Sequence, residues 1–186
     1  MSNDKQSARG NDNIQVAGNN NYIGNGLNLM IPQPRILTHS LVHELLDVVY
    51  SLPPSEDDSY SLQDPVQIRA KLRFNNAPRY TSVIDNHVDD YVRVDEVMKD
   101  YPNSEDIVKK LRDMFLDVAD FDEEKNLRVG DGDSQLDSIK SSLCDMIVAD
   151  SRFDASKHPI EKIEQFCIAL IAYGISKCKI LETPAV

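Results

Sequence analysis

The sequence predicts a mainly α-helical protein, a multi-helix bundle of about six helices preceded by a short N-terminal β arm. Two observations carry this prediction. From residue 35 onward, apolar side chains recur three or four residues apart, the spacing of a helix that buries one face. Before residue 35, apolar and polar residues alternate in short runs bounded by glycine, which is typical of strands. We therefore assign residues 1–34 to an Asn/Gly-rich β arm and linker, and residues 35–186 to a helical bundle domain.

The arm contains the run NDNIQVAGNNNYIGN, residues 11–25. Its alternation and glycines predict two short strands around an Asn/Gly turn, and the following IPQP, residues 31–34, is a stiff spacer. A lone hairpin is only marginally stable in water, so we expect the arm to pair with strands of another chain. The apolar residues of the arm are therefore interface candidates: Ile14, Val16, Tyr22 and Ile23.

The first three helices follow from apolar spacing and from proline. The first is expected to start near Leu37 and to end before Pro53. The second starts at Asp64, which can cap it, and breaks before Pro78. The third is expected to run without interruption from about Pro78 to Lys99. Its apolar residues are Val83, Ile84, Val88, Tyr91, Val94, Val97 and Met98.

Three more helices follow. Ser104 can cap the fourth, whose apolar face runs to Val118. A loop, DFDEEKNLRVGDGD, then leads to a fifth helix with apolar residues from Leu136 to Ile147. The sixth has Pro159 in its first turn and is the most hydrophobic segment, so we expect it at the centre of the bundle. The tail CKILETP is expected to pack back over the bundle.

Charge and composition limit the classes of partner. Aspartate and glutamate outnumber lysine and arginine by 31 to 20, and the net charge of −11 opposes direct binding to nucleic acid or to an anionic membrane. The sequence has no apolar run long enough to span a membrane and no signal peptide. Its three cysteines lack CxxC spacing, as expected of reduced thiols. These features predict a cytoplasmic protein.

Two patterns resemble metal sites. His39 and His43 are four residues apart and could face one ion on a helix, but no third ligand is evident and the HExxH order is absent. The run GDGDSQLD resembles the start of a calcium loop, but it places Leu136 and Ser142 where that loop needs Gly and Glu, so Asp133 is better explained as a helix cap. No nucleotide-binding or nucleophile motif occurs. We therefore predict no enzymatic activity, no cofactor and no metal, with a histidine-based metalloenzyme as the minor alternative.

A basic cluster stands out in this acidic chain. The run QIRAKLRFNNAPRY contains four cations beside two aromatic side chains. Such a cluster either solvates the outside of a helix or contacts phosphates or an acidic partner surface. The interface candidates here are Arg69, Arg73, Arg79 and Tyr80.

The same run resembles the pattern P-F-x-I-x-x-K-I-x-Y-N-x-x-x-x-Y, and the tail resembles C-K-I-L-E-x-P after an apolar helix. The matching positions are Pro65, Val66, Ile68, Lys71, Leu72, Phe74, Asn75, Tyr80, Cys178, Lys179, Ile180, Leu181, Glu182 and Pro184. Together the two motifs are similar to the accessory helical domain of bacterial ABC-three-component systems, of which Lamassu-type antiphage defence is an example. The Asn/Gly-rich arm resembles short N-terminal tags of bacterial conflict-system proteins.

The resemblance implies partners and a role. It implies an SMC-like ABC ATPase and an effector as partners, within a homo- or hetero-oligomer. The expected function is a non-enzymatic accessory or assembly subunit of an antiviral defence complex that oligomerises through its arm. The alternative is an acidic inhibitor or antitoxin-like protein that occupies a basic nucleic-acid-binding surface. That alternative depends on the carboxylates of one segment: Asp85, Asp89, Asp90, Asp95, Glu96 and Asp100.

Overall fold

The computed structural model describes residues 39–51 and 63–184, all within the unit that spans Arg35–Val186. The predicted β arm, with its interface candidates Ile14, Val16, Tyr22 and Ile23, lies outside the described residues. The prediction of a mainly helical bundle is confirmed, with seven helices and one two-stranded sheet in the described part of the chain. The elements are α1 Leu41–Ser51, α2 Gln63–Phe74, α3 Pro78–Asp85, α4 Val88–Asp100, α5 Ser104–Val118, β1 Asp120–Phe121, β2 Leu127–Arg128, α6 Gly132–Val148 and α7 Ile160–Ser176.

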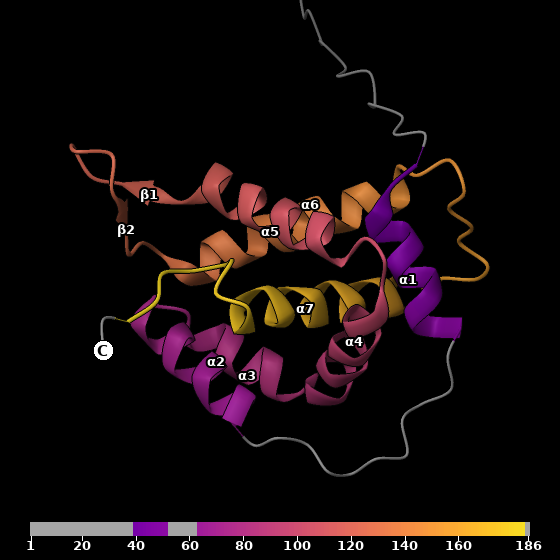
Figure 1. The fold of residues 1–186 in the computed structure, drawn as a ribbon, viewed down its shortest axis with the longest axis horizontal. Coiled ribbons are helices and arrows are strands. Elements are labelled where there is room, and N and C mark those ends of the chain that lie inside the picture. Colours follow the sequence, from indigo (N-terminus) through magenta and orange to yellow (C-terminus); the bar gives the residue numbers. More distant parts are fainter. Residues whose placement is uncertain (1–38, 52–62, 185–186) are drawn as a thin grey trace, which may run out of the picture. The chain divides into compact units, whose positions relative to one another are not determined.

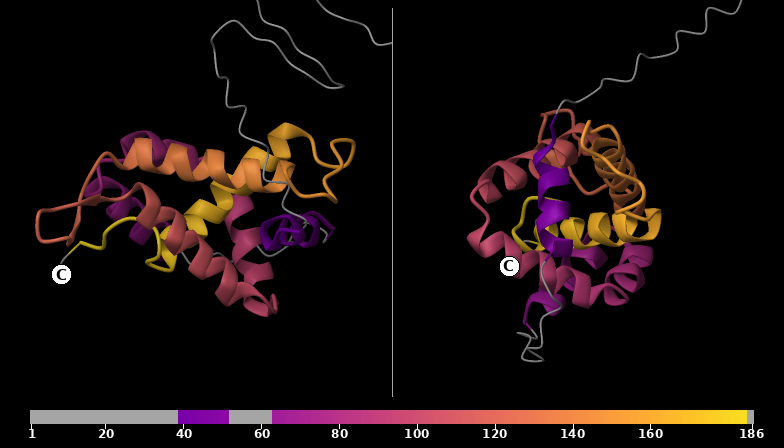
Figure 2. Two further views of the ribbon diagram at one scale, coloured as in Figure 1. Left: turned by 90° about the horizontal axis from the view of Figure 1, so that it is seen from above. Right: turned by 90° about the vertical axis from the view of Figure 1, so that its right-hand side faces the viewer.

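Helix α7 lies at the centre of the bundle, as its hydrophobicity predicts. The helices α5 and α6 lie on one side of it and α2, α3 and α4 on the other, while α1 crosses near its N-terminal end (Figure 1). Every residue from Phe166 to Ile175 is buried. A helix that is apolar on all sides is stable only where neighbours cover all of it. The two further views show the other helices packed around this axis (Figure 2).

The predicted single helix from Pro78 to Lys99 is wrong. The chain forms α3 and α4 with a turn between them, closed by a hydrogen bond from the His87 N–H to the Ile84 carbonyl at 2.9 Å. The break lets Ile84 and Tyr91 both enter the core, with 5% and 4% of their surface exposed. Apolar spacing continues across the turn, so tertiary packing rather than the local pattern sets this break.

The segment between α5 and α6 also differs from the expected loop. It contains the short antiparallel hairpin β1–β2, in which Asp120 pairs with Arg128. The cap of α6 is Asp131, whose carboxylate accepts from the Ser134 N–H at 3.1 Å. The predicted cap, Asp133, instead accepts the N–H groups of the first turn of α3. The Asp133 carboxylate of α6 thus stabilises the positive N-terminal end of α3.

The C-terminal tail packs back over the bundle, as expected. Ile180 and Leu181 are buried, with 0% and 1% exposed. Helix α7 ends in a turn where the Lys179 N–H donates to the Gly174 carbonyl at 2.9 Å and Cys178 has φ of 56°. This is the Schellman arrangement, in which glycine is favoured at the left-handed position. A Cβ added to Gly174 would lie 2.6 Å from Ile180 Cδ1, so any larger residue there would have to displace the Ile180 side chain where the tail crosses the helix.

Replacing Cys178 should separate backbone strain from side-chain contacts. A side chain in the left-handed region costs about 1 kcal/mol or more, which glycine avoids. We expect Cys178→Gly to unfold in urea at a higher midpoint than Cys178→Ala, with a difference in unfolding free energy of about 1 kcal/mol. Equal urea midpoints for Cys178→Gly and Cys178→Ala would contradict the expected cost of the left-handed backbone at residue 178.

Candidate functional site

The two sequence motifs that carry the family resemblance meet in the structure at the C-terminal end of α2. The side-chain amide of Asn75 donates to the Glu182 carbonyl at 2.7 Å, and its Oδ1 accepts from the Glu182 N–H at 2.9 Å. The same amide also donates to the Lys71 carbonyl at 2.8 Å. Asn75 is 2% exposed. Its side chain thus binds the tail as a neighbouring strand would. We call this contact between α2 and the tail the motif junction.

A buried cation completes the junction. Lys71 is 4% exposed, and its ammonium donates to the Ile175 carbonyl at 3.3 Å, at the negative end of α7. Burial lowers the pKa of Lys71, while nearby Glu182 acts in the opposite direction. A lysine this buried is rare unless its charge has partners. Sequence reasoning placed Lys71 in the basic cluster but did not predict that it would be internal.

The start of α6 is attached to the same point. The Gly132 N–H donates to the Asn75 carbonyl at 2.9 Å, and the Asn76 side chain donates to the Gly130 carbonyl at 3.1 Å. A Cβ on Gly132 would lie 2.3 Å from the Asn75 oxygen, so only glycine permits this approach. Three segments distant in sequence, α2, the tail and the α6 N-terminus, are therefore joined through Asn75 and Asn76.

Tyr80, predicted as an interface residue, has to be reassigned. It is 2% exposed, and its hydroxyl donates to Asp137 at 3.0 Å. Burial, with the hydrogen bond to Asp137, raises the pKa of Tyr80. The ring belongs to the core. Its neighbour Arg79 forms an ion pair with Asp137 but keeps 54% of its side chain exposed.

The remaining basic candidates lie on the surface. Arg69 pairs with Asp85 at 2.9 Å and is 45% exposed. Arg73 is exposed and lines an open cavity of about 620 Å³ together with Pro78 and Asp133. Phe74, within the same motif, is 42% exposed. We use the name α2 surface for the exposed arginines and the exposed aromatic residue of this region, which are Arg69, Arg73, Phe74 and Arg79.

The spacing of His39 and His43 suggested a possible metal pair, but the group of possible metal ligands among the described residues contains His43 and not His39. His39 is exposed, whereas His43 is 1% exposed and faces Asp47 and His158. Within the described part of the chain, neither ring nitrogen of His43 forms a hydrogen bond, although Nδ1 lies 3.4 Å from Asp47 Oδ2. Leaving a buried polar group unpaired costs about 1–3 kcal/mol. His158 could not be found from sequence, because only the fold brings the loop before α7 to α1.

The loop between α6 and α7 fixes α1 through charged groups that sequence reasoning also missed. The Asp150 side chain is fully buried and accepts from Arg152 Nη2 at 2.8 Å and from the Ser40 N–H. Arg152 also pairs with Glu44 at 2.8 Å. The Arg152 guanidinium holds the pKa of the Asp150 carboxyl well below its usual range.

The acidic segment that supports the alternative function is partly neutralised within the bundle. Asp95 is contacted by two lysines, Asp85 pairs with an arginine, and Asp90 lies 2.9 Å from the ring of His87. These carboxylates therefore contribute less to an external electrostatic field than their number suggests. The contacts are Arg69–Asp85, His87–Asp90, Lys99–Asp95 and Lys177–Asp95.

Comparisons of the chain with protein-family models, with curated proteins and with solved structures found no match. Among the described helices, none has the length and apolar character needed to cross a membrane.

Proposed function

We propose that this protein is a non-enzymatic assembly subunit of a bacterial antiviral complex of the ABC-three-component, Lamassu-like kind. Its partners would be an SMC-like ABC ATPase and an effector, and its place of action the cytoplasm. The motif junction is the observation that supports this proposal most. Asn75 and Glu182 lie 107 residues apart in sequence, yet they exchange two hydrogen bonds. Two motifs that are each weak alone thus form one structural unit.

The α2 surface supports docking through this unit. It exposes an aromatic ring and three arginines, of which Arg69 pairs with Asp85 and Arg79 with Asp137, on an acidic chain. Aromatic and arginine side chains are the residue types that contribute most at protein interfaces. Arg73 and Phe74 immediately precede Asn75, so the buried junction anchors this part of the surface. A partner with an acidic groove and an apolar pocket would be complementary to it.

A charge reversal tests this surface. We expect Arg73→Glu to weaken association with the partner by about tenfold or more while leaving stability within about 0.5 kcal/mol, because Arg73 is exposed. Lys125→Glu, in the exposed β1–β2 turn, changes the net charge equally and is the matched control. Equal affinities of the two variants, measured by titration calorimetry, would remove the α2 surface from the interface.

Co-purification tests the proposed function itself. The tagged full chain is expressed in its native host with the neighbouring genes present, and the bound proteins are identified by mass spectrometry. We expect a long coiled-coil ATPase to co-purify in a stoichiometric amount and to be lost with Arg73→Glu. Recovery of nucleases or other nucleic-acid-binding proteins, through contacts that weaken steeply with salt, would instead support the acidic inhibitor.

A further inference from the structure

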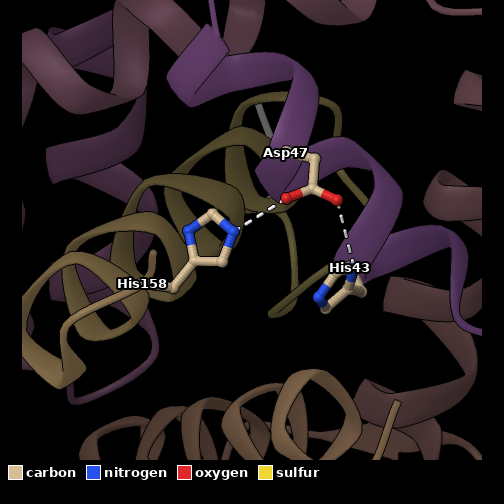
Figure 3. Close-up of side chains that lie close together, drawn as sticks. All are labelled: His43, Asp47 and His158. Atoms are coloured by element: carbon tan, nitrogen blue, oxygen red, sulfur yellow. Dashed lines mark hydrogen bonds and ion pairs between the residues drawn. The ribbon is translucent and has the colours of Figure 1, made fainter. Parts of the chain in front are cut away.

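Three side chains that can bind a metal converge where α1 meets the loop before α7. His43 and Asp47 lie four residues apart on one face of α1, and His158 reaches them from the loop (Figure 3). Asp47 Oδ1 lies 2.7 Å from His158 Nε2, and Asp47 Oδ2 lies 3.4 Å from His43 Nδ1. One donor atom from each residue can be chosen so that all three lie within 4.8 Å of one another.

Both histidines of this cluster are almost completely buried. His43 is 1% and His158 is 7% exposed, and their rings are nearly perpendicular, with centroids 6.0 Å apart. Among the described residues, His43 Nε2 and His158 Nδ1 have no hydrogen-bond partner, and His43 Nδ1 has only its 3.4 Å ion-pair contact with Asp47. Buried imidazoles normally find a partner for each nitrogen. A buried imidazole nitrogen that forms no hydrogen bond has a lone pair available to bind a metal ion.

The donor set indicates the class of ion. Two imidazole nitrogens and one carboxylate oxygen suit zinc and neighbouring divalent transition metals, whereas magnesium and calcium prefer oxygen ligands alone. Zinc bonds to nitrogen and oxygen are about 2.0–2.2 Å long, which places tetrahedral donors about 3.4 Å apart. The contact of Asp47 with His43 has that spacing, at 3.4 Å, the contact of Asp47 with His158 is shorter, at 2.7 Å, and one donor from each residue lies within 4.8 Å of the others. Half of the Asp47 side chain, 51%, is exposed, so water can supply the fourth ligand.

We propose that His43, Asp47 and His158 bind one divalent transition-metal ion of the zinc class, which ties α1 to the loop before α7. Binding compensates the Asp47 charge and gives each imidazole a bond to the ion through one of its two nitrogens. The ion adds a cross-link to the polar contacts that Arg152 already makes between the same two segments. This site is separate from the motif junction and does not depend on the proposed function.

The tag-free full chain, with metal removed by chelation, is titrated with Zn²⁺ by calorimetry and with Co²⁺ by absorption spectroscopy. We expect one equivalent to bind with a Kd of about 1 µM or tighter, and Zn²⁺ to raise the Tm by about 5 °C. Mg²⁺ should produce neither effect. Asp47→Ala, which changes a half-exposed side chain, should weaken binding at least about 100-fold and abolish the rise in Tm. Circular dichroism establishes that this variant folds.

Two further variants serve as controls and one extends the test. His39→Ala removes the exposed histidine of the same segment, and Cys178→Ser removes an exposed thiol, so both should bind Zn²⁺ like the unaltered chain. His158→Ala should bind as weakly as Asp47→Ala. Absence of one-equivalent binding, unchanged affinity in Asp47→Ala, or loss of binding in His39→Ala would each overturn the proposal.

Discussion

Asp150→Ala is expected to lower the free energy of unfolding by about 3–5 kcal/mol. The carboxylate is fully buried and accepts from Arg152 Nε at 2.9 Å, Arg152 Nη2 at 2.8 Å and the Ser40 N–H. Without it, the buried Ser40 N–H loses its partner and the Arg152 guanidinium keeps only Glu44 and the Ser40 carbonyl, and an unpaired group in a protein interior is costly. Helix α1 should then detach from the loop after α6.

Urea unfolding followed by circular dichroism measures this effect. Asp145→Ala, an exposed position on α6, is the control and should change stability by no more than about 0.5 kcal/mol. If Asp150→Ala lowered the free energy of unfolding by less than about 1 kcal/mol, the ion pair of Asp150 and Arg152 would not hold α1 in place.

The Asp150 carboxyl also predicts how the stability of the chain depends on pH. The pKa of Asp150 is lowered by Arg152 in the folded chain, while an unfolded aspartate titrates near about 3.9. A depressed folded pKa contributes stability that is fully present above the unfolded pKa and is lost as pH falls toward the folded pKa. The unaltered chain should therefore lose more stability below about pH 4 than Asp150→Ala does. Parallel curves from urea unfolding at several pH values would contradict this assignment.

Asn75→Ala should lower the free energy of unfolding by about 2–4 kcal/mol, because three hydrogen bonds of a buried side chain are lost. The tail is the segment that should respond most, since both backbone groups of Glu182 lose their partner. We expect hydrogen exchange to accelerate in residues 178–184 well beyond the rest of the chain. Gln67→Ala, exposed on α2, is the control. Unchanged exchange in the tail would show that Ile180 and Leu181 hold it without Asn75.

The sequence predicted those features that depend on local pattern. The apolar run of α7 indicated its central position, and the burial of Ile180 and Leu181 follows from two apolar residues after a helix end. The break between α3 and α4 was missed because apolar spacing runs through it unchanged. The role of Asp133 was misassigned because a capping carboxylate can serve a helix that is distant in sequence.

The candidate sites also combine features that local sequence pattern predicts with features that only tertiary structure determines. Arg69 and Arg73 remain on the surface, as basic helix residues usually do, but Tyr80 is internal, where Asp137 on α6 accepts a hydrogen bond from its hydroxyl. The metal-binding cluster needs His158, whose position near α1 depends on how the loop before α7 folds. Spacing along one helix can suggest two ligands, whereas the third comes from tertiary structure.

The central claim is that this chain acts as a subunit of a larger assembly. The mass of that assembly is its most direct test. Light scattering after size-exclusion chromatography is applied to the full chain and to residues 35–186, each co-expressed with the neighbouring gene products. We predict that the full chain forms a particle well above its own 21.0 kDa and that removal of residues 1–34 reduces that mass. A full chain that elutes alone at 21.0 kDa would contradict the account.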